Sequence, residues 1–124
     1  LGALDSTALL SVFDKITPGN VEQMKKINEK MYQTCSSNKD ISKYFDLNNA
    51  FHNVYLKKSK NKFLLDQLSI LRQRLFDFGA KGDWIAKVRE MNYREHLEFI
   101  SLIEEGDAKA VANFLRDVHM VINW

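Results

Sequence analysis

Three histidines are the side chains of this chain best suited to chemistry. His52, His96 and His119 each lie on or beside the apolar face of a different segment with helical spacing. Imidazole is the commonest metal ligand in proteins, and three imidazoles meeting in a helical core would leave positions open for water or an anionic ligand. Asn48 precedes His52 by one helical turn and would add an amide oxygen. The pattern predicts a site for a divalent metal (Zn, Ni, Mn or Fe) formed by His52, His96, His119 and Asn48.

The same histidines also have a simpler interpretation. A histidine on an apolar helix face is more commonly a hydrogen-bonded core residue than a ligand. Three such residues in one domain of 124 residues favour convergence on one polar pocket. The alternative that stays open is a purely structural helical interaction module, in which the histidines are polar core residues.

Motifs of known enzyme classes are missing from the sequence. A dinuclear carboxylate bundle needs Glu-x-x-His on its helices, but the residues three before the histidines are Asn49, Tyr93 and Arg116. The chain contains no His-Glu-x-x-His, no Gly-x-Ser-x-Gly and no glycine-rich phosphate loop. Cys35 has no histidine close in sequence. The sequence therefore favours a binding protein that is not an enzyme, with a small helical metalloenzyme using the same histidines as the alternative.

Arginines and one further asparagine are candidates for holding a ligand beside the histidines. Arg72 and Arg74 lie in the middle of the fourth apolar segment, and a guanidinium at the margin of a buried pocket suits a carboxylate. An arginine can equally lay its aliphatic stem across the edge of a core. Asn92 shares the apolar face of His96. We therefore take Arg72, Arg74 and Asn92 as candidate ligand-binding residues.

Helical spacing of apolar residues runs through nearly the whole chain, and one proline and five glycines leave few interruptions. Thr17 before Pro18 is a helix start signal, as are Asp83 and Asp107. These features predict an all-α, antiparallel bundle of about six helices joined by short turns. The expected helices cover about 3–15, 17–34, 40–58, 61–79, 83–106 and 107–122.

The composition fits one domain over residues 1–124. Of its 124 residues, 45% are hydrophobic, which excludes a disordered chain. No apolar run approaches the roughly 18 residues of a membrane span. A net charge of +2 is too balanced for nucleic-acid binding by charge alone, and we interpret the lysines of 57–62 as a solvated turn. A single cysteine indicates a reducing, cytoplasmic compartment.

Five short motifs follow one another along the chain. They are Asn48-Asn49-Ala50-Phe51-His52, Ser59-Lys60-Asn61-Lys62-Phe63-Leu64, Glu95-His96, Glu105-Gly106-Asp107-Ala108 and Leu115-Arg116. In this order the chain resembles the FCD domain, the C-terminal effector-binding and dimerisation domain of the FadR subfamily of bacterial GntR-type transcription regulators. The resemblance covers residues from about 3 to 119.

This resemblance implies a helical bundle whose core binds a small carboxylate or similar metabolite, in many members through a divalent metal held by one aspartate and three histidines. It also implies a homodimer that transmits ligand binding to attached DNA-binding domains. In the parent protein, an N-terminal winged helix-turn-helix domain would bind operator DNA. That domain is absent from this chain, and we expect Leu1 to be the edge of a longer protein.

Two positions depart from the family pattern. The family aspartate is Asn48 here, so a neutral amide replaces an anionic ligand. Counting from His96, the family's last histidine falls on Val118, and a shift by one residue turns a side chain about 100° around a helix. His119 would then reach the site only through rotation of the sixth helix or a local bulge, and would otherwise face away from it. The sequence predicts that the sixth helix buries Val111, Leu115, Val118 and Ile122.

Overall fold

The computed structural model describes residues 2–79 and 84–119, and this part of the chain is all-α. Two 3-10 turns, η1 (Phe13–Lys15) and η2 (Asn38–Asp40), precede the second and third helices, and a π-helical turn, η3 (Leu115–His119), continues the last one. The all-α bundle predicted from the sequence is confirmed. Its helices are α1 (Gly2–Val12), α2 (Pro18–Thr34), α3 (Ile41–Leu56), α4 (Lys62–Gly79), α5 (Trp84–Glu105) and α6 (Ala108–Phe114).

Helix starts predicted from the sequence are present at α2 and α6. The Thr17 side chain accepts a hydrogen bond from the Asn20 N–H, and the Asn20 side chain accepts one from the Thr17 N–H, which forms a capping box. Asp107 accepts from the Ala110 N–H and caps α6. Gly106 has a φ of 82°, a conformation that favours glycine, and makes the turn between α5 and α6.

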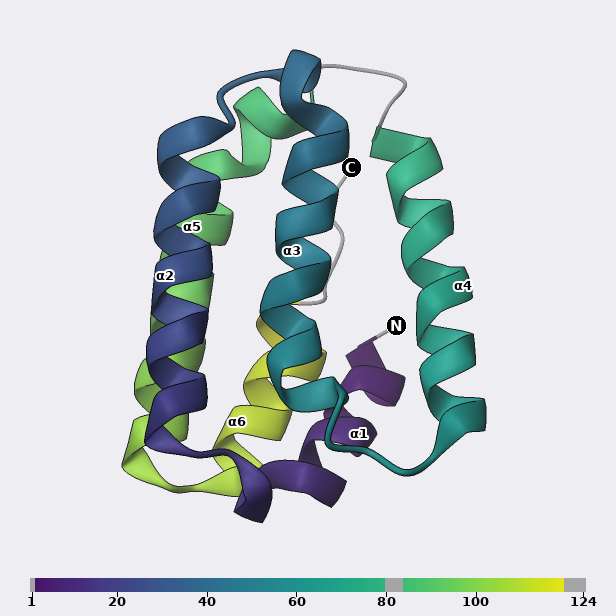
Figure 1. Cartoon of the computed structure of the whole chain (residues 1–124), viewed down its shortest axis with the longest axis vertical. Helices are drawn as coiled ribbons and strands as arrows, with labels where there is room; N and C mark the ends of the chain where they lie inside the picture. The colour runs from purple at the N-terminus through teal and green to yellow at the C-terminus, as the bar shows by residue number, and fades with distance from the viewer. Residues whose placement is uncertain (1, 80–83, 120–124) are drawn as a thin grey trace.

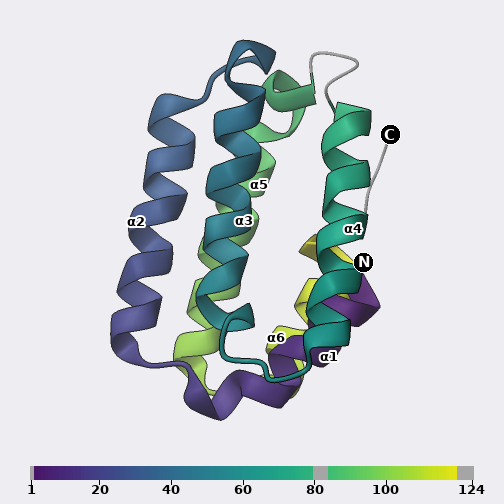
Figure 2. The ribbon, with the colours of Figure 1, turned by 45° about the vertical axis from the view of Figure 1, so that its right-hand side comes forward.

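Three long helices form one side of the bundle. In Figure 1, α2 and α3 run side by side with α5 behind them, and Figure 2 shows the same arrangement after a rotation. α1 crosses the lower end, where it packs against α6, η3 and α3. α4 stands on the other side of α3 and also contacts α1. The first helix therefore contacts both the C-terminal turn and α4.

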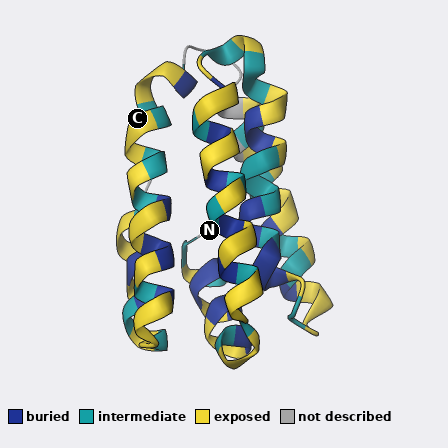
Figure 3. Ribbon diagram, turned by 60° about the vertical axis from the view of Figure 1, so that its left-hand side comes forward, coloured by how far each residue is buried: buried dark blue, intermediate teal, exposed yellow. Residues whose placement is uncertain are grey.

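Apolar side chains fill the space between these helices, and Figure 3 shows the buried residues on their inward faces. A larger cluster, drawn from α1 to α6, is centred on fully buried residues such as Leu9, Phe51, Phe99 and Leu115. A smaller cluster at the other end of the long helices contains Met31, Cys35, Tyr44, Phe45 and Ile85.

Some polar side chains are buried within this apolar interior. Burial of a polar group costs free energy unless the group is hydrogen-bonded, so such residues mark the place to look for a site. Among the described residues they are Asp5, Ser6, Asn28, His52 and His96.

Helix boundaries at the first and third segments differ slightly from the sequence-based expectation. The first α-helix ends at Val12, and the chain tightens into η1 instead of continuing as a regular helix to Lys15. The third begins at Ile41 after η2 and ends at Leu56. The lysine-rich residues 57–61 form the predicted turn before α4. None of the described helices is long and apolar enough to cross a membrane.

The sixth segment departs most from expectation. It is α-helical only to Phe114 and then opens into the π-helical turn η3. Val118, which a regular helix was expected to bury, is 45% exposed. That prediction is wrong because the wider turn places one additional residue between successive contacts of the buried face. The expectations for Asp83 and Ile122 lie outside the described residues.

Candidate metal centre

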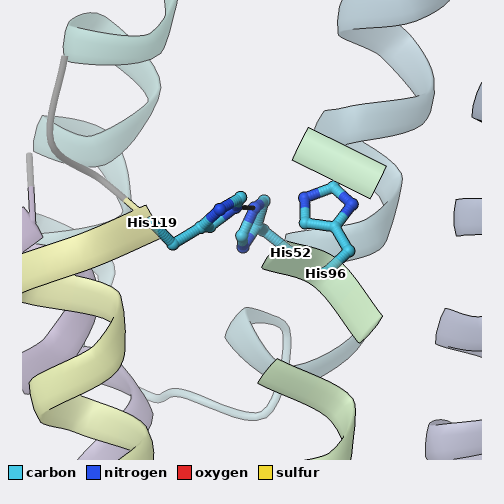
Figure 4. Close-up of side chains that lie close together, drawn as sticks. All are labelled: His52, His96 and His119. Carbon is cyan, nitrogen blue, oxygen red and sulfur yellow. Dashed lines mark hydrogen bonds between the residues drawn. The ribbon is translucent and has the colours of Figure 1, made fainter. Parts of the chain in front are cut away.

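Three helical elements bring the three histidines together. His52 comes from α3, His96 from α5 and His119 from η3, and one ring nitrogen of each lies within 4.8 Å of the others. Figure 4 shows the three rings side by side. His52 and His96 are fully buried, and the side chain of His119 is 3% exposed. The predicted convergence of the histidines on one place in the core is therefore present.

The π-helical turn decides where His119 points. A turn with i→i+5 hydrogen bonds holds one residue more than an α-helical turn, and such turns occur frequently at functional sites. Here the turn over Leu115–His119 directs Val118 to the surface and His119 into the core. A local bulge, one of the two routes by which His119 was expected to reach the site, is therefore present as this π-helical turn.

His52 is held in one tautomer by a chain of hydrogen bonds. Its Nδ1 lies 2.7 Å from the Tyr55 hydroxyl oxygen, and the Tyr55 hydroxyl donates to Asp5 Oδ1 at 2.6 Å. Because the hydroxyl proton is directed to the carboxylate, the hydroxyl oxygen accepts from His52 Nδ1–H. His52 Nε2 therefore carries a lone pair, and it faces the cluster.

His96 is oriented by an asparagine. The Asn28 amide nitrogen donates to the Tyr93 carbonyl at 3.2 Å, so Asn28 Oδ1 is free to accept from His96 Nδ1–H at 2.9 Å. The His96 ring also stacks on Phe51, with centroids 3.9 Å apart and planes inclined by 11°. His96 Nε2 is buried and has no hydrogen-bond partner among the described residues. This nitrogen is therefore a buried acceptor that faces the other two histidines.

His119 is oriented by a carboxylate. Its Nδ1 donates to Glu95 Oε1 at 2.9 Å, and its Nε2 lies 3.3 Å from His52 Nε2. When both rings are neutral, the form that binds a metal ion, both Nδ1 atoms are donors and two nitrogen lone pairs face each other across this distance. Neutral rings in that arrangement repel each other, and a cation between them removes the repulsion.

The spacing of the two nitrogens fits a metal ion. Zinc binds imidazole nitrogen at about 2.0–2.1 Å, so two ligands of a tetrahedral ion are about 3.3–3.4 Å apart. The separation of His52 Nε2 and His119 Nε2 is 3.3 Å. A metal-binding histidine typically donates its other ring N–H to a carboxylate, a carbonyl or water, and the hydroxyl, amide and carboxylate acceptors here have that role. The residues present fit the metal predicted from the sequence.

Burial keeps two of the rings neutral. It lowers the pKa of His52 well below its ordinary value, and the positive charge of Arg72 and the neighbouring His119 and His96 lower this pKa further. Burial, followed by His119, likewise lowers the pKa of His96 well below its ordinary value. The neutral ring is the form that binds a metal ion.

The other candidate residues lie at different distances from the cluster. Asn48 Oδ1, one helical turn before His52 on α3, is buried and has no hydrogen-bond partner among the described residues. Arg72 donates to Asp5 Oδ2 at 2.9 Å and so joins the hydrogen-bond chain that ends at His52. Asn92 donates to the Tyr44 hydroxyl, and Arg74 is exposed on α4.

Sequence reasoning missed four residues that hold the histidines: Asp5, Asn28, Tyr55 and Glu95. Asp5 and Asn28 are polar residues within apolar helix faces, which is the signal that could have identified them. Glu95 directly precedes His96 on α5, and its partner is His119 on another element. None of these pairings is visible from spacing along one helix.

An all-α bundle that gathers acceptor nitrogens in its core belongs to the class of helical proteins that bind ligands between facing helices. The chain belongs to the FCD-domain family, because the model of that family matches residues 1–119. FCD domains are ligand-binding regulatory domains of GntR-type regulators and are not a known enzyme family. No curated protein and no solved structure is significantly similar to the chain.

Proposed function

We propose that this chain is the effector-sensing and dimerisation domain of a bacterial GntR-type transcription regulator of the FadR subfamily. It binds a divalent metal ion and, through that ion, a small carboxylate or similar metabolite. The observation that carries the proposal is the orientation of the histidines, whose three Nδ1 atoms each have a separate partner. This arrangement leaves the three Nε2 lone pairs together in a buried place.

The metal would be held by His52, His96 and His119, with Asn48 as a fourth ligand. Two observations support Asn48: its Oδ1 is buried without a partner, and it lies on α3 one turn from His52. An amide oxygen carries no charge, so the metal would keep more of its positive charge than with a carboxylate ligand. Three imidazoles favour Zn, Ni or Fe over Mn, which prefers oxygen ligands.

The effector would bind at the open positions of the metal. A metal ion with these neutral ligands attracts an anion, and Arg72, whose charge is paired with Asp5, is linked to His52 through Asp5 and Tyr55. Asn92 would supply an amide to the same ligand. The carboxylate is therefore the class of effector that the charges favour.

Ligand binding would act on the arrangement of helices. The three histidines come from α3, α5 and η3, so an ion and its ligand tie these elements together. A ligand with different affinity for two arrangements shifts the population between them. In a homodimer, such a shift would change how DNA-binding domains elsewhere in the longer protein fit their operator.

Thermal unfolding of the chelator-treated protein tests this function. A ligand at 100 times its Kd stabilises the native state by about 2.7 kcal/mol, and we expect Zn²⁺ or Ni²⁺ to raise Tm accordingly. A panel of small organic acids should raise Tm further only after metal is added. The double variant His52→Ala, His96→Ala should lose both responses.

The control is a variant that removes a helix cap away from the cluster, Thr17→Ala, whose side chain accepts from the Asn20 N–H at the start of α2. It should unfold at lower temperature and keep both responses. A wild-type protein whose Tm no metal changes would contradict the proposal. So would a response that is equal in wild type and double variant, because the metal would then be bound elsewhere.

A further inference from the structure

The hydrogen-bond chain at His52 differs from the contacts of the other two histidines. His96 and His119 each donate directly to a side chain, Asn28 or Glu95. His52 donates to a hydroxyl that itself donates to a carboxylate, and this carboxylate is paired with a guanidinium. The chain runs from α3 through α1 to α4 and links residues up to 67 positions apart in sequence.

All members of the chain are removed from water. Asp5, Tyr55 and His52 are fully buried, and the Arg72 side chain is 11% exposed. Water therefore cannot replace a missing member, and each hydrogen bond has one available partner. Burial, followed by the negative charge of Asp5, raises the pKa of Tyr55 well above its ordinary value, so the hydroxyl keeps the proton it donates.

We propose that Tyr55 and Asp5 are positioning residues for the metal centre: they hold His52 in the Nδ1–H tautomer and so present its Nε2 lone pair to the ion. The direction of the hydrogen bonds, from His52 to Asp5, fixes this tautomer. Arg72 holds the Asp5 carboxylate, the carboxylate accepts a hydrogen bond from the Tyr55 hydroxyl, and the hydroxyl oxygen can then only accept from His52. The tautomer is a property of the protein itself and exists before metal binds.

Loss of the Tyr55 hydroxyl would allow His52 to adopt its other tautomer. Without an acceptor at Nδ1, His52 can adopt the Nε2–H tautomer and donate to His119 Nε2, which lies 3.3 Å away. That hydrogen bond would use the two nitrogens that the metal needs. The substitution Tyr55→Phe therefore turns a metal-ready pair into a hydrogen-bonded pair.

The first test uses metal-free protein and imidazole ¹⁵N chemical shifts, which distinguish the two tautomers. We expect His52 of the wild type to be in the Nδ1–H form and Tyr55→Phe to populate the Nε2–H form. The matched control is Tyr44→Phe, since Tyr44 is also a buried tyrosine of α3 but its hydroxyl bonds Asn92. His52 should keep the Nδ1–H form in this control.

The second test measures Zn²⁺ affinity by competition with a chelator, and it rests on the proposed function. Partners of metal ligands typically contribute 10–100-fold to affinity, so Tyr55→Phe should bind Zn²⁺ about 10–100-fold more weakly than wild type and Tyr44→Phe should bind it equally well. In a His52→Ala background, Tyr55→Phe should cause no further loss, because its effect passes through His52.

The possible outcomes separate the two proposals. A wild-type His52 in the Nε2–H form, or a tautomer unchanged by Tyr55→Phe, would overturn the positioning role. An equal loss of affinity with and without His52 would also overturn it, because Tyr55 would then act only on the fold. A protein with the expected tautomers that binds no metal would contradict the proposed function and leave the orientation of His52 established.

Discussion

Two parts of the molecule place histidines in the same cluster by different means. On α3 and α5, His52 and His96 lie on regular helices, and their positions follow from the 3.6-residue repeat. On η3, His119 reaches the cluster because one turn of the chain is a π-helix. The regular helices repeat a pattern that sequence reasoning can follow, whereas the π-helical turn inserts one residue and changes every direction that follows it.

The comparison has a functional meaning as well as a geometric one. His52 and His96 are fully buried between long helices, whereas His119 lies in the last turn that the structure describes, with its ring against Glu95 and His52. A metal ion would therefore join a pair of ligands on long regular helices to a ligand on the π-helical turn. The following predictions test this difference, beginning with the largest expected effect.

Removal of the pair on the long helices should abolish metal binding. The double variant His52→Ala, His96→Ala leaves His119 as the single histidine ligand. One imidazole and an amide do not form a site that competes with a chelator, so we expect no bound metal after dialysis. Elemental analysis of the dialysed protein measures this. Retention of stoichiometric metal would show that the histidines are not its ligands.

An exchange of the two residues at the π-helical turn tests η3 directly. In the variant V118H/H119V, the histidine occupies the position that is 45% exposed in the wild type, and valine takes the buried one. We expect Zn²⁺ affinity to fall by at least roughly 100-fold, because the variant removes a ligand and the loss of a ligand's partner alone costs about 10–100-fold. Affinity measured by chelator competition that stays equal or increases would show that the turn is a regular α-helix.

The carboxylate beside His119 should have a smaller effect. Glu95→Gln keeps an oxygen that can accept from His119 Nδ1–H but removes the negative charge. We expect Zn²⁺ affinity about 10-fold lower than wild type in the same competition assay. Glu98→Gln, a change of an exposed glutamate on the same helix, is the control and should bind like wild type. Equal affinities in all three proteins would rule out a role for Glu95 in orienting His119.

The pH dependence of the metal-free protein should reflect the buried pair. The pKa of His52 and of His96 is lowered by burial in the folded state, so the unfolded chain binds more protons than the folded one once the pH falls towards 6.5. The free energy of unfolding therefore has its full value above about pH 6.5 and decreases below it. The decrease is about 1.4 kcal/mol per pH unit for each histidine that is protonated only in the unfolded chain.

Urea unfolding of chelator-treated protein between pH 5 and 8 measures this dependence. Added Zn²⁺ should keep this slope or make it steeper, because a bound metal excludes protons from the histidines of the folded chain and binds more weakly as the pH falls. A free energy of unfolding that rises as the pH falls from 7 to 5 would contradict the burial of neutral rings.

The spacing of apolar residues was enough to predict the helices and the inward positions of His52 and His96, which lie on regular helices. The stripe that includes Tyr44, Phe51 and His52 on α3 repeats every three or four residues, and the packing of the bundle preserves it. The caps at Thr17 and Asp107 were equally local, since each residue bonds a backbone N–H three positions away. Such signals depend on neighbours within one helical turn.

The remaining parts of the site depend on contacts between distant segments. Tyr55 and Asp5 are 50 residues apart, and His119 and Glu95 are 24 residues apart, so the spacing within one helix carries no information about either pair. The π-helical turn is likewise a tertiary feature, because a regular helix over the same residues would bury Val118 and expose His119. α1 and α5, which lie far away in sequence or on another helix, both pack against this turn.

The central claim is that three histidine nitrogens form one metal site, and X-ray absorption spectroscopy of the zinc-loaded protein tests it most directly. We predict one zinc ion per chain with three imidazole ligands at about 2.0–2.1 Å, and loss of this signal in the double variant His52→Ala, His96→Ala. A zinc environment of oxygen ligands alone, or a spectrum that the double variant leaves unchanged, would contradict the account.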